Sequence, residues 1–593
     1  MKSLVQEQIA RALAALVDGG ELAADALPEV QVERSRGGEH GDFASPVALG
    51  LARTLRRKPR DIAQRIAELL PGDARIARVD VAGAGFLNFF LARGALTGVV
   101  GQVLSAGDAY GRSAIGAGHR VQVEFVSANP TGPLHVGHGR GAAHGAAVAN
   151  LLQAAGYAVE REYYINDAGR QMDILALSTW LRYLELMGER CPFPSKGYQG
   201  AYVRDMAASL AARVGDACVV GAAALCAALP PDPCGDDKTA ETGREAHMDA
   251  LIACAKSMLG RARYASVFAH ARDIQVGDIR EDLAQFGVEF DRWFSEQSLA
   301  DSGAVADTLA RLEAGGHVYR EHGTLWFRST AFGDEKDRVV VRENGAATYF
   351  ASDIAYVQDK FLRGYDHLIY VWGADHHGYI ARLRAAAQAL GHDPQRAEIL
   401  LVQFAQLFRG GHKVQMSTRS GEYVTLRELR DEVGRDAARF FYVMRRSEQH
   451  LDFDLDLAKS NQKENPVYYV QYAHARIASN LRRAAQRGLQ VDLTWGLAAL
   501  DRLQLEPEQA LMRTLSRFPE MLEGAARARE PHQVAFYLRD LANDFHAYYA
   551  TDGVRLLDDD AALRNARLAL CAAVAQVIRN GLALLGVSAP ESM

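Results

Sequence analysis

The chain has 593 residues, of which 49% are hydrophobic and 24% are charged, enough for three or four domains that each bury a core. Its formal net charge of −6 excludes global basicity, so any contact with RNA must come from local patches. No apolar run approaches the ~20 residues that a membrane span needs, and residues 1–16 predict an amphipathic helix and not a signal peptide. We therefore expect a cytoplasmic protein without a membrane segment.

The cysteines give no strong signal. Five of the six lie between Cys191 and Cys254, and none forms a C-x-x-C pair. A structural zinc is one interpretation of this cluster, and reduced, mostly buried thiols are the other. We predict no metal site.

Residues 1–115 mix helical and strand-like patterns. A helical pattern from Ser45 to Leu70 is interrupted near Pro59, and Ile76 to Leu91 is strand-like, with turn residues in its middle. The segment contains no set of residues that is typical of a catalytic site. Its basic cluster forms either a solvated face or an RNA contact, and consists of Arg53, Arg56, Arg57, Lys58 and Arg60.

The strongest functional signal lies in residues 121–150. Val121–Val126 alternates as a strand does, and the Asn, Pro and Gly residues at 129–133 cannot continue it. A tightly packed, Ala-rich helix is predicted from about Gly139 to Ala155. The motif His135-Val136-Gly137-His138 therefore lies where a strand, a turn and a helix meet.

This geometry suits a nucleotide. A helix N-terminus offers unpaired N–H groups to a phosphate, and Gly137, Gly139 and Gly141 leave room for a close approach. Two histidines three positions apart can both donate to a phosphate oxygen. Three other interpretations remain: a fragment of a metal site, a dinucleotide fingerprint whose spacing fails at Ala142, and ordinary residues at a helix start.

Alternating strands and helices continue after this motif, with Ala158–Tyr164 as the next strand. Such alternation predicts a parallel sheet with right-handed crossovers, in which ligands bind at the carboxyl ends of the strands. Glu124, Asn129 and His135 should cluster at that edge. Residues 178–270 interrupt the pattern as a long, mostly helical insertion.

Beyond the insertion the core is expected to resume. Strand-like stretches occur at Phe286–Phe290, Gly323–Arg328, Arg338–Arg342, Leu368–Trp372 and Val402–Phe408. A helix from about Tyr349 would place Tyr349 and Asp353 on one face. Gly373–Gly378 follows a buried strand and so takes the ligand-binding position again.

The last part of the chain begins with a polar, glycine-bounded loop at Arg409–Gly421 and is predicted to be helical nearly to its end after Thr425. The helix Pro466–Arg487 carries tyrosines followed by arginines. This pattern indicates either aromatic core residues next to a solvent-exposed face of the helix or a surface that stacks on bases and binds phosphates.

Three stretches resemble a known family. VEFVSANPTGPLHVGH, from Val123 to His138, resembles the signature of the class I aminoacyl-tRNA synthetases, and in particular the arginyl-tRNA synthetase version. Met416-Ser417-Thr418-Arg419 resembles the second class I signature, the loop that closes on the ATP phosphates, although Gln415 and Thr418 replace its usual lysines. Asp436-Ala437-Ala438-Arg439 resembles the start of the family's anticodon-binding domain. The resemblance covers essentially the whole chain.

The resemblance implies an α/β fold: a Rossmann-like parallel-sheet catalytic core with an inserted domain, an N-terminal α+β domain and a C-terminal all-α anticodon-binding helical bundle. The expected boundaries are 1–115 for a tRNA-contacting domain, 116–425 for the catalytic domain and 426–593 for the bundle. The implied reaction activates L-arginine with ATP to arginyl-adenylate and transfers arginine to the 3′-terminal adenosine of tRNA(Arg). ATP with Mg²⁺ is a substrate, no tightly bound cofactor is expected, and the protein should be a monomer.

The resemblance also implies site residues. Catalysis would involve His135, His138, Lys413, Ser417 and Arg419. Arginine would be bound by Glu124, Asn129, Tyr349 and Asp353. ATP would contact Gly137, Gly373, Asp375, His376, Val414 and Met416, and tRNA would contact Tyr472, Arg476, Arg482 and Arg483.

Two other functions compete with this interpretation. An enzyme that makes a small adenylated metabolite could share the H-x-G-H motif, but it predicts a more compact chain. A non-catalytic RNA-binding relative is supported only by the two replaced lysines of the second signature.

Overall fold

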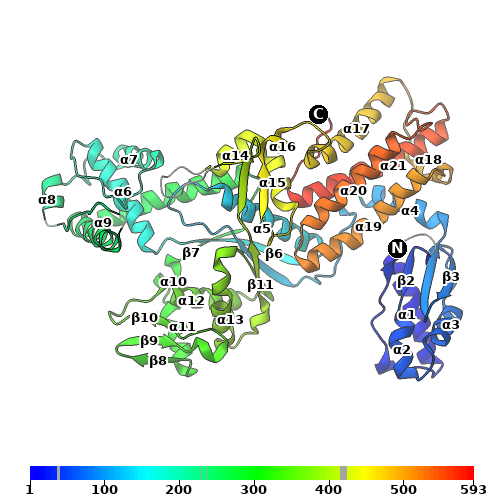
Figure 1. Cartoon of the computed structure of the whole chain (residues 1–593), viewed down its shortest axis with the longest axis horizontal. Helices are drawn as coiled ribbons and strands as arrows, with labels where there is room; N and C mark the ends of the chain where they lie inside the picture. Colours follow the sequence, from blue (N-terminus) through cyan, green and yellow to red (C-terminus); the bar gives the residue numbers. More distant parts are fainter. Residues whose placement is uncertain (36–39, 228, 236, 415–423) are drawn as a thin grey trace.

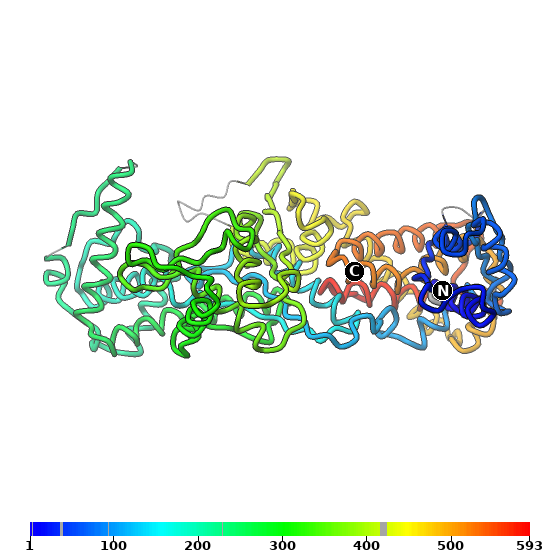
Figure 2. Tube along the Cα trace, turned by 90° about the horizontal axis from the view of Figure 1, so that it is seen from below, coloured from blue at the N-terminus to red at the C-terminus, as the bar shows by residue number. Residues whose placement is uncertain are grey.

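The computed structural model describes the chain except for residues 36–39, 228, 236 and 415–423 and the side chains of Ser3 and Arg93. The molecule is elongated (Figures 1 and 2). The N-terminal unit (blue) and the last long helices (orange to red) occupy one end, and the inserted helices (cyan to green) occupy the other. The parallel sheet lies between them.

The N-terminal unit is a small α+β fold with its own core. Its elements are α1 (Lys2–Asp18), β1 (Glu33–Arg34), β2 (Phe43–Ser45), α2 (Val47–Leu55), α3 (Pro59–Leu69), β3 (Ile76–Ala82) and β4 (Phe86–Leu91). The strands form an antiparallel sheet in the order β1-β2-β4-β3. Pro59 is the first residue of α3, where its missing N–H is harmless, and Arg56 ends α2 with a φ of 49°. The predicted interruption of the helix is confirmed.

Five parallel strands form the central sheet in the order β12-β11-β5-β6-β7. They are β5 (Arg120–Phe125), β6 (Ala158–Ile165), β7 (Arg292–Ser295), β11 (His367–Gly373) and β12 (Ala397–Val402). The helix α5 (Val136–Ala154) packs against β5, and a Cβ on its Gly145 would lie 2.3 Å from the Phe125 ring. Small residues are therefore needed where this helix crosses the sheet, and the predicted strand–turn–helix is confirmed.

Three sequence predictions about strands were wrong. The stretches at 323–328 and 338–342 form strands, but they pair in a separate antiparallel sheet and not in the parallel core. The expected strand at 402–408 is two strands, because the chain leaves the central sheet after Val402 and starts β13 (Ala405–Arg409) in a second sheet. The apolar run continues across this break, so the hydrophobic pattern does not reveal it. Phe286–Phe290 lies in the turn before β7, although both phenylalanines are packed in the core.

The insertion consists of helices with a separate core. Its elements are α6 (Arg170–Leu186), α7 (Ala201–Val214), α8 (Ala222–Cys226) and α9 (Lys238–Gln285), the last with a kink at Gly260. After β7 the chain leaves the central sheet a second time. This segment consists of α10 (Gln297–Asp301), α11 (Ala304–Ala314), the antiparallel strands β8 (Val318–Glu321), β9 (Thr324–Phe327) and β10 (Arg338–Val341), and α12 (Tyr349–Leu362). Helix α13 (Ile380–Ala389) then leads to β12.

The described part of the chain after β13 is mostly helical. Strands β14 (His412–Lys413) and β15 (Leu451–Asp454) pair with β13, so the prediction of helix throughout after Thr425 was wrong at β15. The helices are α14 (Leu426–Val433), α15 (Arg435–Val443), α16 (Leu455–Lys459), α17 (Pro466–Gln486), α18 (Leu493–Ala498), α19 (Glu506–Ala528), α20 (His532–Tyr549) and α21 (Ala561–Leu585), and α4 (Arg93–Ala106) packs on α19 and α21.

Helix α21 is long and apolar enough to cross a membrane, since its most apolar 18-residue window has a mean hydropathy of 1.8, and the sequence prediction overlooked this. However, 72% of its most apolar window is buried inside the structure. We therefore assign α21 as the core helix of the bundle.

Arg439 joins the bundle to the catalytic core. It is fully buried on α15, and its guanidinium donates to the backbone carbonyls of Phe286, Gly287 and Leu585 at 2.9–3.1 Å. Asp436, three residues earlier, accepts from Gln471 on α17 at 3.0 Å. The motif that the sequence singled out at 436–439 is thus a joint between three segments.

Candidate active site

The backbone is strained immediately after β5. Val126 and Ser127 have positive φ angles of 67° and 40°, a region that side chains rarely occupy and that is especially unfavourable for a β-branched residue. The Ser127 hydroxyl offsets part of this strain, because it donates to Glu124 at 3.1 Å and accepts from the Tyr164 N–H at 3.1 Å. This turn carries the chain around the mouth of a cavity.

The cavity has a volume of about 370 Å³ and lies at the carboxyl ends of β5, β6 and β11, against α12. It contains three carboxylates, several aromatic rings and few aliphatic side chains. Its lining includes Glu124, Tyr164, Asn166, Glu296, Tyr349, Asp353, Tyr356, Tyr370, Trp372, Gly373, His376 and Tyr379. Five residues that the sequence predicted for arginine or ATP therefore meet here: Glu124, Tyr349, Asp353, Gly373 and His376.

Two of the carboxylates are poised for a cation. Burial and the charge of Glu124 raise the pKa of Asp353 to about 6, although Tyr379 donates a hydrogen bond to it. Burial, followed by the charges of Asp353 and Asp167, raises the pKa of Glu296 to about 7. The Oε2 atom of Glu296 is buried without a hydrogen-bond partner among the described residues. A bound cation would supply the missing partner.

Glu124 differs from these two carboxylates because its oxygens are already engaged. Oε2 accepts from the Nζ of Lys360 at 2.5 Å, and Oε1 accepts from Ser127. Sequence reasoning missed both Lys360 and Glu296. Glu296 directly follows β7, so a correct placement of that strand would have drawn attention to it.

His135 and His138 lie at the start of α5 with their rings stacked 3.7 Å apart. The Nδ1 of His135 accepts from the Gly137 N–H at 3.1 Å, and the Nδ1 of His138 accepts from the His135 N–H at 3.2 Å. Burial lowers the pKa of His135, and burial together with His135 lowers the pKa of His138 to about 3. Both rings are thus neutral at pH 7 with the proton on Nε2, which makes each of them a hydrogen-bond donor on that side.

The glycines of the motif have different surroundings. A Cβ on Gly137 would meet the His135 ring at 2.8 Å and Phe404 at 3.8 Å, so Gly137 borders the exposed Phe404 side chain. A Cβ on Gly139 would lie 2.7 Å from Leu426 and 3.0 Å from Tyr442. Gly139 therefore allows the C-terminal helices to pack on α5. The prediction that Gly139 leaves room for a nucleotide was wrong.

The second signature segment is described only at its two ends. Before it, Lys413 in β14 pairs with Phe408, and the Val414 N–H donates to the Leu407 carbonyl at 2.9 Å. After it, the chain bonds to the histidine motif, because the Val136 N–H donates to Val424 at 3.1 Å and the Leu426 N–H donates to Leu134 at 2.8 Å. Met416, Ser417 and Arg419 lie outside the described residues. Both ends are thus fixed next to the strands and the helix of the site.

Two predicted residues lie at the rim of the cavity and not in its lining. Asn129 is exposed, accepts from Asn166 at 3.0 Å and donates to Gln171 at 2.8 Å, so it contacts the lining through Asn166. Asp375 is exposed just beyond Gly373 and lies 3.8 Å from His376.

The four residues predicted to contact tRNA come together on α17. Tyr472, Arg476, Arg482 and Arg483 line a second cavity of about 420 Å³ with Tyr549 and the last residues of the chain. The Arg476 guanidinium lies between the rings of Tyr472 and Tyr549, 4.5 and 4.6 Å from their centroids. Arg482 donates to the Glu591 carbonyl at 2.8 Å.

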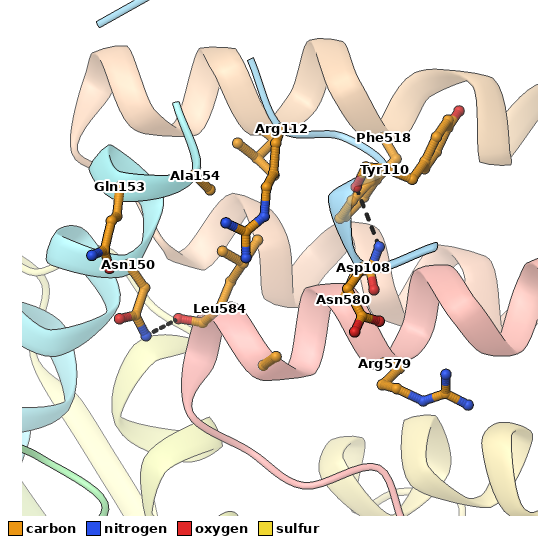
Figure 3. A pocket seen from close by; sticks show the side chains of 12 residues that line it. Asp108, Tyr110, Arg112, Asn150, Gln153, Ala154, Phe518, Arg579, Asn580 and Leu584 are labelled. Carbon is orange, nitrogen blue, oxygen red and sulfur yellow. Dashed lines mark hydrogen bonds between the residues drawn. The ribbon is translucent and has the colours of Figure 1, made fainter. Parts of the chain in front are cut away.

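A further cavity of about 370 Å³ lies between the C-terminal end of α5 and helices α19 and α21 (Figure 3). Asn150 of α5 donates to the Leu584 carbonyl at 3.0 Å, and Asn580 donates to the Tyr110 carbonyl at 3.2 Å. None of the predicted site residues lines it. We regard it as a gap in the packing where the core meets the C-terminal helices.

A parallel sheet with a histidine motif at the start of its first helix and a polar cavity at its carboxyl edge is the arrangement of a nucleotide-dependent ligase. Residues 99–185 and 268–457 match the family model described as "tRNA synthetases class I (R), catalytic domain". The chain is therefore a class I aminoacyl-tRNA synthetase. The two matched segments leave out residues 186–267, which lie within the inserted helices.

The remaining matches specify the family further. Residues 3–91 match "Arginyl tRNA synthetase N terminal domain", and residues 470–593 match "DALR anticodon binding domain". Arginine–tRNA ligases of Thioalkalivibrio sulfidiphilus and Legionella pneumophila are 58% and 51% identical over the full lengths of both chains. The arginyl-tRNA synthetase of Thermus thermophilus has a similar structure, with a TM-score of 0.71 and 25% identity over 100% of each chain. The chain belongs to the arginyl-tRNA synthetase family.

Proposed function

We propose that the cavity beside β5 binds arginine for the reaction of this family, which joins arginine to tRNA with the use of ATP. The main support is the pair Asp353 and Glu296, two carboxylates in one cavity whose pKa values are raised toward neutrality by burial and by neighbouring carboxylates. A guanidinium group is planar, always charged and rich in donors, so it matches such a pair. Tyr349 and Trp372 supply apolar surface for the aliphatic stem of arginine.

Asn129 is proposed to hold the other end of the substrate, and Glu124 is proposed to line the arginine pocket together with Asp353 and Tyr349. Asn129 bonds to Asn166 in the cavity lining and can orient the α-amino or carboxylate group. In the first step, an oxygen of the arginine carboxylate attacks the α-phosphorus of ATP in line, and the bond to the bridging oxygen breaks to release pyrophosphate. In the second step, a ribose hydroxyl of the terminal adenosine of tRNA attacks the acyl carbon and AMP leaves.

A carboxylate is already a competent nucleophile, so positioning and charge stabilisation can provide most of the catalysis. The neutral rings of His135 and His138 would donate their Nε2–H groups to phosphoryl oxygens as charge develops there. Gly137 and Phe404 would form the surface under the adenine ring, and the end of β11 at Asp375 and His376 would border the nucleotide.

Mg²⁺ is proposed to enter with the ATP phosphates. Among the described residues, no group of three or more His, Cys, Asp or Glu side chains is arranged to hold a metal ion. Lys413, Val414, Met416, Ser417 and Arg419 remain the predicted contacts to the phosphates in the second signature. With lysines replaced at 415 and 418, Lys413 and Arg419 are the cations that we assign to pyrophosphate.

The surface of α17 is proposed to contact tRNA. Arg476 and Arg483 have no carboxylate partner within ion-pair distance among the described residues, so their charge is available to phosphates. We further propose three domains divided near residues 115 and 425, a monomeric state and a cytoplasmic location.

The decisive experiment is the charging of total cellular tRNA with each of the twenty amino acids in the presence of ATP and Mg²⁺. Charging with arginine alone is the expected result. Charging with another amino acid would contradict the proposed cavity. Binding of tRNA without any charging would favour a non-catalytic relative and would point first to the replaced lysines.

A further inference from the structure

Lys360 on α12 is a fully buried lysine directly beneath the cavity. Its Nζ donates to Glu124 at 2.5 Å and lies 4.2 and 3.9 Å from the ring centroids of Tyr356 and Tyr370. An ammonium group without access to water is unfavourable unless it is paired. Lys360 does not line the cavity, but its partner Glu124 and both tyrosines do.

The surroundings of Lys360 contain an excess of acidic groups. Burial lowers the pKa of Lys360, and the charges of Glu124 and of the fully buried Glu162 partly offset this by stabilising the ammonium group. Arg363 forms a second ion pair with Glu162. On the open side, Asp353 and Glu296 face the cavity, and neither forms an ion pair with a cationic side chain among the residues that the structure describes. Without Lys360, the charge of Glu124 would lie unscreened beside Asp353 in a region of low dielectric constant.

We propose that Lys360 is a positioning residue for arginine: it holds the Glu124 carboxylate at the cavity wall and offsets its charge, so that Asp353 and Glu296 can carry the charge that the guanidinium meets. This inference rests on the proposed binding of arginine in the cavity. Lys360 acts through Glu124 and does not touch the substrate.

The test is the Lys360→Met variant, which keeps the aliphatic stem and removes the charge. The KM for arginine in tRNA charging is measured from pH 6 to pH 9 at saturating ATP and tRNA. We expect the arginine KM at pH 7 to rise about tenfold or more with a smaller change in kcat, because a buried carboxylate loses its partner. The KM for ATP should not change.

The pH profile provides a readout that a purely structural role would not alter. The charged or titratable groups around Lys360 are Glu124 on β5, Glu162 on β6, Tyr356 and Arg363 on α12, and Tyr370 on β11. Loss of the ammonium leaves the charge of Glu124 uncompensated next to Asp353, which raises the pKa of Asp353, so the pH below which arginine affinity is lost should move up by about one unit. A variant with a lower melting temperature but an unchanged arginine KM and pH profile would overturn the proposal.

A double variant covers the case in which Lys360→Met does not fold. Glu124→Gln with Lys360→Met removes both charges together and leaves no unpaired buried ion. If Lys360 acts through Glu124, the double variant and Glu124→Gln alone should have the same arginine KM. A further loss in the double variant would show that Lys360 acts independently of Glu124 and would overturn the proposal.

Lys256→Met is the matched control, because Lys256 also pairs with a carboxylate, Asp173 at 2.8 Å, near the ring of Tyr264, but lies in the insertion. Its arginine KM should be unchanged. Asp353→Asn separates the two proposals. If it raises the arginine KM and Lys360→Met does not, only the role of Lys360 fails, whereas no effect of Asp353→Asn means that the cavity is not the arginine site.

Discussion

Two buried polar clusters in this molecule differ in how completely their groups are paired. At the joint between core and bundle, the guanidinium of Arg439 meets three backbone carbonyls within 3.1 Å. In the cavity beside β5, one oxygen of Glu296 has no hydrogen-bond partner in the described part of the chain, and the turn after β5 is strained at Val126 and Ser127. Paired groups stabilise a fold, whereas unpaired groups and strain are kept where a ligand completes them.

The largest effect is expected at the joint. Replacing Arg439 with Met leaves three buried carbonyls without a donor, which should reduce the free energy of unfolding by about 3–5 kcal/mol. The midpoint of urea unfolding, followed by the helical signal, measures this loss. The folded fraction should keep its KM for arginine.

Arg435→Met on the same helix serves as the control for Arg439, since Arg435 is exposed and lies near Asp436 at 3.4 Å. Its unfolding midpoint should be almost unchanged. Equal midpoints for the two variants would mean that the joint is not the stabilising contact we describe.

A smaller effect of a different kind is expected in the cavity. Asp353→Asn retains a hydrogen-bond acceptor for Tyr379 but removes a charge from the guanidinium site. We expect kcat/KM for arginine to fall by about 10²–10³ with little change in the KM for ATP or in stability. Asp307→Asn, at an exposed position of the neighbouring α11, should have no effect. Equal small changes for arginine and ATP would remove Asp353 from the arginine site.

The sequence predicts those parts of the site that lie within one short continuous stretch of the chain, and it does not predict those that depend on contacts between distant segments. The strand at β5, the helix that carries His135 and His138, and the pair Tyr349 and Asp353 are each encoded in a short continuous stretch, and the family resemblance assigned them roles. Glu296 was missed because β7 has only four residues, and the apolar residues at 286–290 suggested that the strand lies earlier in the chain. The predicted strand ends at Phe290 whereas β7 ends at Ser295, so the prediction placed the carboxyl end five residues too early and away from Glu296.

Lys360 was missed for a different reason. It lies seven positions after Asp353, on the same face of α12, and only the packing of β5, β6 and β11 around that face shows that its charge is buried. The break between β12 and β13 was also invisible, because the apolar run LLVQFAQLF continues through it. In each case the deciding contact joins segments that are distant in sequence.

The pH dependence of arginine binding sharpens the comparison further. Glu296 and Asp353 have pKa values raised to about 7 and about 6, so both are partly protonated below neutrality when the cavity is empty. Arginine binds the ionised forms, and its affinity should therefore fall by about tenfold between pH 8 and pH 6. Isothermal titration across this range measures the change, and Glu296→Gln should flatten the part near pH 7.

Stability should respond to pH in the opposite direction. Because the folded pKa values exceed the unfolded ones, these two groups stabilise the empty protein below about pH 4 and lose that contribution as the pH rises through 6 and 7. Bound arginine should compensate, so the increase in melting temperature caused by arginine should be larger at pH 8 than at pH 6. An increase that does not depend on pH would contradict the assignment of both carboxylates.

The smallest effect is expected on α17, where an arginine that forms no ion pair with a carboxylate among the described residues is compared with one that does. Arg476 packs on Tyr472 and Tyr549 without a carboxylate partner within ion-pair distance among the described residues, whereas Arg502 of the same bundle forms two hydrogen bonds with Asp560 at 2.6 and 2.9 Å. Arg476→Ala should raise the KM for tRNA about fivefold and reduce the salt dependence of tRNA binding by about one counterion. Arg502→Ala should leave both unchanged, because its charge is already neutralised. If the two variants lower tRNA affinity equally, the net charge of the bundle matters and the surface around Tyr472 is not a specific contact.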